Sequence, residues 1–226
     1  MLSLLVLIAS LISCEAKSSK DIPCQWDSHT GSVFDLRRLI KAASSPSYQL
    51  NDGDIPCTPE TEPTFTYTFN FCADVTPQSV PQACIKKGKV FLIHCKNVAV
   101  YTQHCNLLGK SGVALQSMWF TDSPGGYDCY VIGTYNPEQD DLVYSLLDPK
   151  DPSKGVTMTY PQGDLCQAVG TGGVTQKVYR SATLDVVCAN VPNAVVVSAN
   201  EPHTCGYHLT VKSYYGCPTV SFVVNF

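Results

Sequence analysis

Twelve cysteines constrain this 226-residue chain more than any other feature of its sequence. Cytosolic thiols stay reduced, whereas cysteines that follow a secretory leader are usually paired as disulfides. The chain opens with MLSLLVLIASLISCEA, an apolar stretch of secretory length that ends at small residues. We therefore expect a signal peptide over residues 1–16. The mature protein is expected in the lumen of the secretory pathway (endoplasmic reticulum, Golgi or endolysosome) or outside the cell.

The position of cleavage decides how many cysteines can pair. Cleavage after Ala16 removes Cys14 and leaves eleven, an odd number. Three arrangements stay open: one free thiol, one disulfide to another chain, or cleavage before Cys14. LISC also resembles a bacterial lipoprotein box. No later stretch has the length and hydrophobicity of a transmembrane helix, and residues 24–226 are expected to form a single domain.

Charge and composition exclude several classes of function. The net charge is −4 and the chain has no long basic run, so nothing indicates a nucleic-acid partner. The sequence has no nucleophile elbow, no zinc-protease motif and no paired-carboxylate signature. We predict no enzyme and no cofactor. The pairs His94–Cys95 and His104–Cys105 resemble metal ligands, but in an oxidising lumen we expect these cysteines in disulfides and therefore no metal.

Short alternating segments are typical of an all-β protein. In TFTYTFNFC (64–72) aromatic residues alternate with threonines, as in a strand with one buried face. Gly and Pro turns separate the other candidates, which favours a sandwich or flattened barrel. One helix is expected in SVFDLRRLIKAA (32–43), whose apolar residues cluster at helical spacing. The other strand candidates are KVFLIHC, NVAVYTQHC, ALQSMWF, YDCYVIGTY, DLVYSLL, GVTMTY, RSATLDVVC, AVVVSA, GYHLTV and TVSFVVNF.

Two C-terminal segments place charged residues on faces that should be buried. Arg180 shares a face with Ala182 and Leu184, and Glu201 shares one with Tyr207 if the same parity runs back along the chain. An unpaired buried charge costs several kcal/mol, so both residues need partners. Two alternatives stay open: a structural ion pair that closes one end of the barrel, or a polar ligand such as a sugar. Sugar hydroxyls suit both groups, because each hydroxyl donates and accepts.

The segment EPHTCGYHLTVKSYYGCP (201–218) resembles the closing motif of the mannose 6-phosphate receptor homology (MRH) domain. This lectin module occurs in lysosomal-sorting receptors and in the β subunit of glucosidase II. The similarity runs in order over about residues 24–220, through CQWDSHTGSVFDL, YTFNFC, GVTMTYPQGDLC and RSATLDVVC. It implies a disulfide-bonded flattened β-barrel that binds mannose-containing glycans of glycoproteins, phosphorylated or not. Its expected roles are sorting or quality control.

The resemblance also implies a set of sugar-binding residues. Arg180 opens the Arg-Ser strand, Glu201 precedes the Cys-X-Tyr motif, and Tyr207 is the tyrosine of that motif. Gln78 follows the cysteine of YTFNFC, with Gln82 and Gln103 as neighbouring alternatives. In such a site Gln and Arg would address the 2-hydroxyl of mannose, and Glu and Tyr the 3- and 4-hydroxyls. The implied carbohydrate-binding set is Gln78, Arg180, Glu201 and Tyr207.

The disulfides implied by the resemblance are Cys24–Cys72, Cys166–Cys205 and Cys188–Cys217. Cys84 is expected to join Cys95 or Cys105, and the pattern gives no partner for Cys57 or Cys129.

Phosphate recognition stays open. Asp164 lies in the loop that contacts the phosphate in receptors for mannose 6-phosphate, but Lys177 is the single cation in the stretch that comes after it, QAVGTGGVTQK. The tryptophan of members that read plain mannose is also missing before Arg180. The rival function is a protein-interaction module on the same barrel, of the sorting or autophagy-related type. A glycoprotein or membrane-receptor partner, or a partner enzyme served by a non-catalytic subunit, is compatible with either function.

Overall fold

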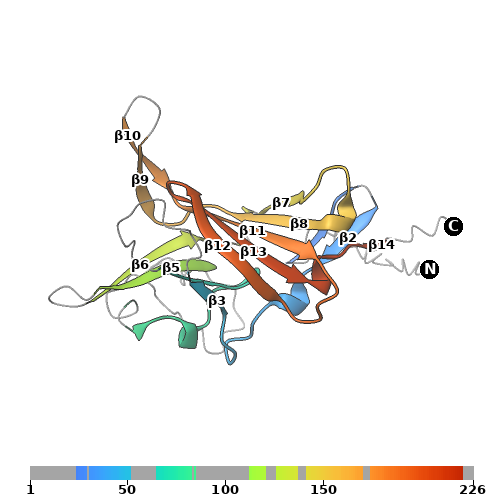
Figure 1. The fold of residues 1–226 in the computed structure, drawn as a ribbon, viewed down its shortest axis with the longest axis horizontal. Helices are drawn as coiled ribbons and strands as arrows, with labels where there is room; N and C mark the ends of the chain where they lie inside the picture. Colours follow the sequence, from blue (N-terminus) through green and yellow to red (C-terminus); the bar gives the residue numbers. More distant parts are fainter. Residues whose placement is uncertain are drawn as a thin grey trace, which may run out of the picture.

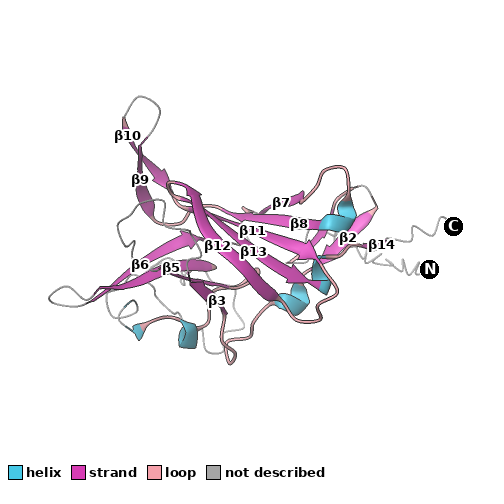
Figure 2. Ribbon diagram, in the orientation of Figure 1, coloured by secondary structure: helices cyan, strands magenta, loops and turns pink. Residues whose placement is uncertain are grey.

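A computed structural model of the chain shows an all-β fold (Figures 1 and 2). The structure describes residues 24–29, 31–51, 65–82, 84, 112–120, 126–136, 141–169 and 174–220. The expected signal peptide, the strand candidates KVFLIHC and NVAVYTQHC, and Cys57, Cys95 and Cys105 lie outside these residues. Within the described part of the chain, no helix is long and apolar enough to cross a lipid bilayer.

The described strands form two larger and two smaller sheets. The five-stranded sheet has the order β12 (Val195–His203), β13 (Gly206–Ser213), β11 (Ser181–Cys188), β8 (Gly155–Tyr160) and β7 (Val143–Leu146). The four-stranded sheet has the order β3 (Tyr48–Asn51), β4 (Thr66–Phe69), β5 (Ala114–Phe120) and β6 (Gly126–Gly133). The smaller sheets are β1 (Gln25–Asp27), β2 (Ser32–Asp35) and β14 (Thr219–Val220), and the hairpin of β9 (Leu165–Val169) and β10 (Thr175–Tyr179). In Figure 1 this hairpin projects from the body of the molecule.

The two larger sheets enclose the core of a flattened barrel. Strands β11 and β13 run parallel, and the residues predicted to point inward from them are buried, except the half-buried Cys188 at the end of β11. They pack in one cluster with aromatic residues of β4 on the facing sheet. The cluster includes Tyr67, Phe69, Met158, Tyr160, Leu184, Val186, Leu209 and Val211. This arrangement confirms the predicted all-β, flattened-barrel class.

The opposite face of the five-stranded sheet carries polar groups beside the exposed Val143 and Val195. Asp185 points away from the core, and its Oδ2 lies 2.7 Å from His208 Nε2 on the neighbouring strand. Its other oxygen accepts a hydrogen bond from Thr157 Oγ1 at 2.7 Å. The alternation seen in the sequence therefore separates an apolar inner face from a hydrogen-bonded outer face.

The helix predicted over 32–43 is wrong. Ser32–Asp35 is strand β2, which pairs antiparallel with β1 and places Phe34 opposite Trp26. Only Arg37–Leu39 turns, as the 3-10 helix η2. Its entry is held by Asp35, whose Oδ1 accepts hydrogen bonds from the Arg37 backbone N–H and from Arg37 Nε. The apolar residues of this stretch are buried from an extended chain and a single turn, so their spacing mimicked a helical stripe.

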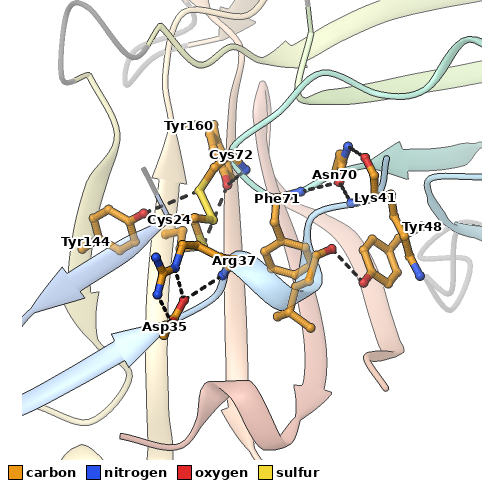
Figure 3. The surroundings of a disulfide bond; sticks show 12 residues. Cys24, Asp35, Arg37, Lys41, Tyr48, Asn70, Phe71, Cys72, Tyr144 and Tyr160 are labelled. Atoms are coloured by element: carbon orange, nitrogen blue, oxygen red, sulfur yellow. Dashed lines mark hydrogen bonds and ion pairs between the residues drawn. A yellow bond between two sulfur atoms is a disulfide. The ribbon is translucent and has the colours of Figure 1, made fainter. Parts of the chain in front are cut away.

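The disulfide Cys24–Cys72 fastens β1 to the chain that follows β4 (Figure 3). Buried Tyr160 reaches this bond from β8, and its hydroxyl accepts the Cys72 backbone N–H at 3.2 Å. Beside it the buried Asn70 side chain accepts from Lys41 N and donates to Lys41 O. Buried polar groups are tolerated when paired in this way, so the bond lies in a hydrogen-bonded corner of the barrel.

The remaining described disulfides are Cys166–Cys205, Cys188–Cys217 and Cys84–Cys129. The first two join the same cysteines that the resemblance pairs. The expected link from Cys84 to Cys95 or Cys105 is wrong, because Cys84 is bonded to Cys129 on β6. Both sulfurs lie in a second small core with Val75, Val80, Leu115 and Val131. This link ties the segment around the 3-10 turn η3 (Pro77–Ser79) to the four-stranded sheet.

We expect non-reducing peptide mapping by mass spectrometry to recover Cys84 linked to Cys129. Replacing both by serine should lower the free energy of unfolding by about 4 kcal/mol, because the bond closes a loop 45 residues long. Denaturant titration measures this change. A Cys84 peptide linked to Cys95 or Cys105 in the native protein would contradict the structure.

Candidate functional site

A backbone seam closes the barrel beside Arg180. Gly163 N donates to Arg180 O at 2.8 Å, and Arg180 N donates to Asp164 O at 2.9 Å. On its other side Asp164 pairs with Val131 of β6: its N–H donates to Val131 O at 2.7 Å, and its Oδ2 accepts from Val131 N at 2.9 Å. Gly163 and Asp164 thus connect the four-stranded sheet to the start of β11, which determines where Arg180 lies.

The Arg180 guanidinium lies between two tyrosine rings. Its Cζ is 4.2 Å from the centroid of the Tyr130 ring and 5.6 Å from that of the Tyr207 ring. Its Nη1 donates a hydrogen bond to the Tyr207 hydroxyl. Its Nε is buried and has no hydrogen-bond partner. An arginine donates through five N–H groups, so this side chain is held in place with donor capacity to spare.

A row of three polar side chains on the four-stranded sheet accompanies this guanidinium. Gln116 of β5 lies directly opposite Tyr67 of β4 and Tyr130 of β6. Its Nε2 lies 3.5 Å from the Tyr67 hydroxyl, and its exposed fraction is only 2%. The Tyr67 and Tyr207 rings are 6.1 Å apart. The row therefore lies beside the pair of Arg180 and Tyr207. We call these five residues the Arg180 cluster: Tyr67, Gln116, Tyr130, Arg180 and Tyr207.

Glu201 reaches this end of the barrel through a bulge. The chain turns at residues 204–205, so Glu201 lies on β12 and not on the strand of Tyr207. The alternation of β13 therefore does not run back to Glu201. The β12–β13 register skips between Asn200 and His203, where two residues of β12 face Tyr207 alone. Such a bulge redirects side chains. Half-buried Glu201 accepts the Cys205 backbone N–H through Oε1 at 2.6 Å.

The predicted glutamine, Gln78, does not belong to the Arg180 cluster. Gln78 lies on the 3-10 turn η3, and its side chain is exposed. Gln116 was missed, although a signal was present in the sequence. In ALQSMWF it is a polar residue at a position whose period-two neighbours, Ala114 and Met118, are buried.

Arg180 and Glu201 do not form the ion pair that the structural alternative requires. The ion pairs of the described residues join Arg37 with Asp35, Lys154 with Asp151, and His208 with Asp185. The described residues also contain no group of three metal-binding side chains. Arg180 is thus held by tyrosines: its Nη1 donates to Tyr207 and its guanidinium lies over the Tyr130 ring.

The Tyr130 hydroxyl is affected by several charges near the Arg180 cluster. It donates to Asp128 Oδ2 at 3.3 Å on the same face of β6. Burial raises the pKa of Tyr130 first, and the negative charges of Asp128 and Asp164 raise it further, while Arg180 lowers it. The cluster therefore combines one cation with nearby carboxylates and four polar side chains that donate or accept neutral hydrogen bonds.

Fold and cluster together define a disulfide-bonded barrel of the MRH class. The chain matches the family model described as "Glucosidase II beta subunit-like protein" over residues 108–225, and it belongs to this family. MRH domains are non-enzymatic and lectin-type, in agreement with the prediction that the chain is not an enzyme. This class and its disulfides are typical of a lumenal or extracellular location.

Two solved structures resemble the chain distantly. One is the solution structure of domain 11 of the echidna mannose 6-phosphate/insulin-like growth factor 2 receptor, with 17% identity, a TM-score of 0.42, and coverage of 87% of this chain and 95% of that chain. The other is the MRH domain of Yos9 complexed with alpha3,alpha6-Man5, with 17% identity, a TM-score of 0.28, and coverage of 45% of this chain and 63% of that one. No curated protein sequence matches the chain.

The seam predicts a strong effect of Gly163→Ala. A Cβ at this position would lie 2.5 Å from Val131 O and 2.9 Å from Arg180 Cβ. We expect the free energy of unfolding to fall by about 1–3 kcal/mol, because neither backbone can move away without breaking the seam. Denaturant titration measures the loss, and NMR signals of the Arg180 side chain should shift with it.

Gly31→Ala is the control for the Gly163 substitution. Gly31 has φ +83° and no atoms within 4 Å of a built Cβ, so only its backbone conformation resists the change. It should cost about 1–2 kcal/mol and leave the Arg180 signals where they are. Equal shifts of the Arg180 signals in both variants would contradict the conclusion that the seam determines where Arg180 lies.

Proposed function

We propose that this chain is a non-catalytic lectin domain that binds mannose-containing glycans of glycoproteins in the secretory pathway or outside the cell. One observation carries the proposal. The Arg180 Nε is buried without a hydrogen-bond partner in a cluster of polar side chains. An unmet buried donor costs about 1–3 kcal/mol, and a ligand hydroxyl would remove that cost.

The chemistry of the Arg180 cluster, together with Glu201 at its border, suits vicinal hydroxyls. Arg180 supplies donors in a planar fork, Glu201 supplies an ionised acceptor, and Gln116 and Tyr207 can both donate and accept. A sugar hydroxyl does both at once, so adjacent hydroxyls can satisfy such a mixed set. We assign the glutamine of the site to Gln116 instead of Gln78, because Gln116 shares the row with Tyr67 and Tyr130.

The charges favour an uncharged sugar over a phosphorylated one. Among the described residues of the cluster and its border, Asp128, Asp164 and Glu201 outnumber the single cation, Arg180. Lys177 is exposed on β10, where it pairs with Gln167. The Asp164 carboxylate already accepts a backbone N–H. Acidic borders repel a phosphate dianion, so plain mannose is the preferred ligand.

Binding should be weak at each site. Each charge-assisted hydrogen bond contributes about 1.5–3 kcal/mol, and this gain must offset the ordering and desolvation of both partners. Affinity for a monosaccharide is expected in the micromolar to millimolar range. Clustered glycans or clustered copies of the domain would strengthen it.

A glycan array probed with the oxidised protein tests the function. Arg180→Lys keeps the charge but loses the donor fork, and Glu201→Gln keeps an acceptor for Cys205 N but loses the charge. Each should weaken binding to high-mannose glycans about tenfold or more, with the fold intact. Binding that survives both substitutions unchanged would contradict the site. A folded wild-type protein that binds no glycan would favour the protein-interaction module.

A matched pair of variants tests which glutamine belongs to the site. Gln116→Leu should reduce mannose affinity about tenfold, since it removes one two-way hydrogen-bonding group from the cluster. Gln78→Leu makes the same chemical change on an exposed turn and should leave affinity unchanged. Titration calorimetry with a mannose oligosaccharide measures both. A larger loss of mannose affinity in Gln78→Leu than in Gln116→Leu would identify Gln78 as the glutamine of the site.

Competition by monosaccharides tests the preference for an uncharged sugar. Mannose 6-phosphate should compete for the bound glycan about tenfold less well than mannose at neutral pH, because of charge repulsion. The double variant Asp128→Asn and Asp164→Asn should narrow this ratio, while each asparagine can still accept a hydrogen bond. Stronger competition by mannose 6-phosphate in the wild-type protein would show that the charge argument fails.

A further inference from the structure

We propose that Tyr130 is a positioning residue, which holds the Arg180 guanidinium in its binding orientation, and that Asp128 holds Tyr130. This inference rests on the proposed sugar site for its effect on affinity. It concerns a residue outside the implied set of four, on the opposite sheet. In this proposal a residue of β6 orients the guanidinium of Arg180, which directly precedes β11.

The geometry of the ring supports a clamp. The guanidinium Cζ lies 4.2 Å from the Tyr130 ring centroid, within the range of about 6 Å over which a cation is attracted to an aromatic face. From the other side Tyr207 accepts the hydrogen bond from Nη1. The ring fixes the plane of the fork, and the hydrogen bond fixes its rotation in that plane. Nε is left without a partner.

The Tyr130 hydroxyl adds a second, smaller restraint on the ring. It donates to Asp128 Oδ2 at 3.3 Å, two residues earlier on the same face of β6. On a strand such neighbours lie side by side, so this bond limits the tilt of the ring. The order of contact is Asp128 to Tyr130 to Arg180.

Arginine side-chain NMR tests the clamp without any sugar. The chain contains three arginines, Arg37, Arg38 and Arg180, so the Nε–Hε spectrum is simple and Arg180→Lys assigns the signal. A guanidinium stacked on a ring experiences a ring-current shift. We expect this shift to persist in Tyr130→Phe, which keeps the ring, and to disappear in Tyr130→Leu, which keeps only an apolar side chain. An Arg180 signal unchanged in Tyr130→Leu would overturn the proposal.

Affinity for mannose oligosaccharide provides the second readout. Tyr130→Leu should bind about tenfold more weakly than the wild type, and Tyr130→Phe should recover most of this loss. Asp128→Asn should give a smaller loss, since asparagine can still accept the tyrosine proton. In the Arg180→Lys background, Tyr130→Leu should have little additional effect. Additive losses in that background would assign Tyr130 a direct or purely structural role and reject the clamp.

The two readouts separate failure of the clamp from failure of the lectin function. A wild-type protein that binds no glycan but shows the ring-current shift, lost in Tyr130→Leu, retains the clamp and rejects the proposed function. A wild-type protein that binds glycan only as strongly as Tyr130→Leu does retains the function and rejects the clamp. Thermal unfolding of each variant identifies any that has simply lost its fold.

Discussion

The site depends on the seam at which Gly163 and Asp164 join the two larger sheets. Four hydrogen bonds tie these residues to Val131 on one side and to Arg180 on the other. They close the barrel without adding a further strand. They also hold the chain at a fixed point between β10 and β11, so Arg180 enters the space between the sheets. A residue that belongs to neither sheet thereby contacts side chains of both.

A guanidinium between the sheets loses hydration, which is unfavourable. The aromatic residues around it offset part of this desolvation penalty. Tyr130 offers its ring face, Tyr207 offers a hydroxyl, and neither brings a full negative charge into contact. A carboxylate in direct contact would neutralise Arg180 and use its donors. Glu201 is kept apart by the bulge in β12 and by its bond to Cys205 N. The disulfide Cys166–Cys205 anchors that turn to β9, and Cys205 O accepts the Ser181 backbone N–H, so the turn is also tied to the start of β11 beside Arg180.

Local periodicity in the sequence was enough to predict most of the strands. GVTMTY and ALQSMWF coincide with β8 and β5, and the buried face of β13 was predicted correctly. Prediction failed where the decisive contact is distant in the chain. Cys84 is bonded to Cys129 because a small core brings them together, and Gln116 enters the Arg180 cluster only through the pairing of β5 with β4 and β6. The expected helix failed differently, since a strand followed by one turn buried residues at helix-like spacing.

The charged groups on the two sides of the five-stranded sheet differ in how completely they are partnered. On the outer face, Asp185 is fully occupied: one oxygen accepts from Thr157 and the other contacts His208. Each of its oxygens therefore has a protein partner on a neighbouring strand. On the inner face the chain places a guanidinium with an unmet donor, beside polar side chains drawn from four strands. Arg180 is therefore only partly partnered: its Nη1 donates to Tyr207 and its guanidinium lies over the Tyr130 ring, but its Nε has no acceptor. In the lectin function that we propose, a hydroxyl of the sugar would provide this acceptor.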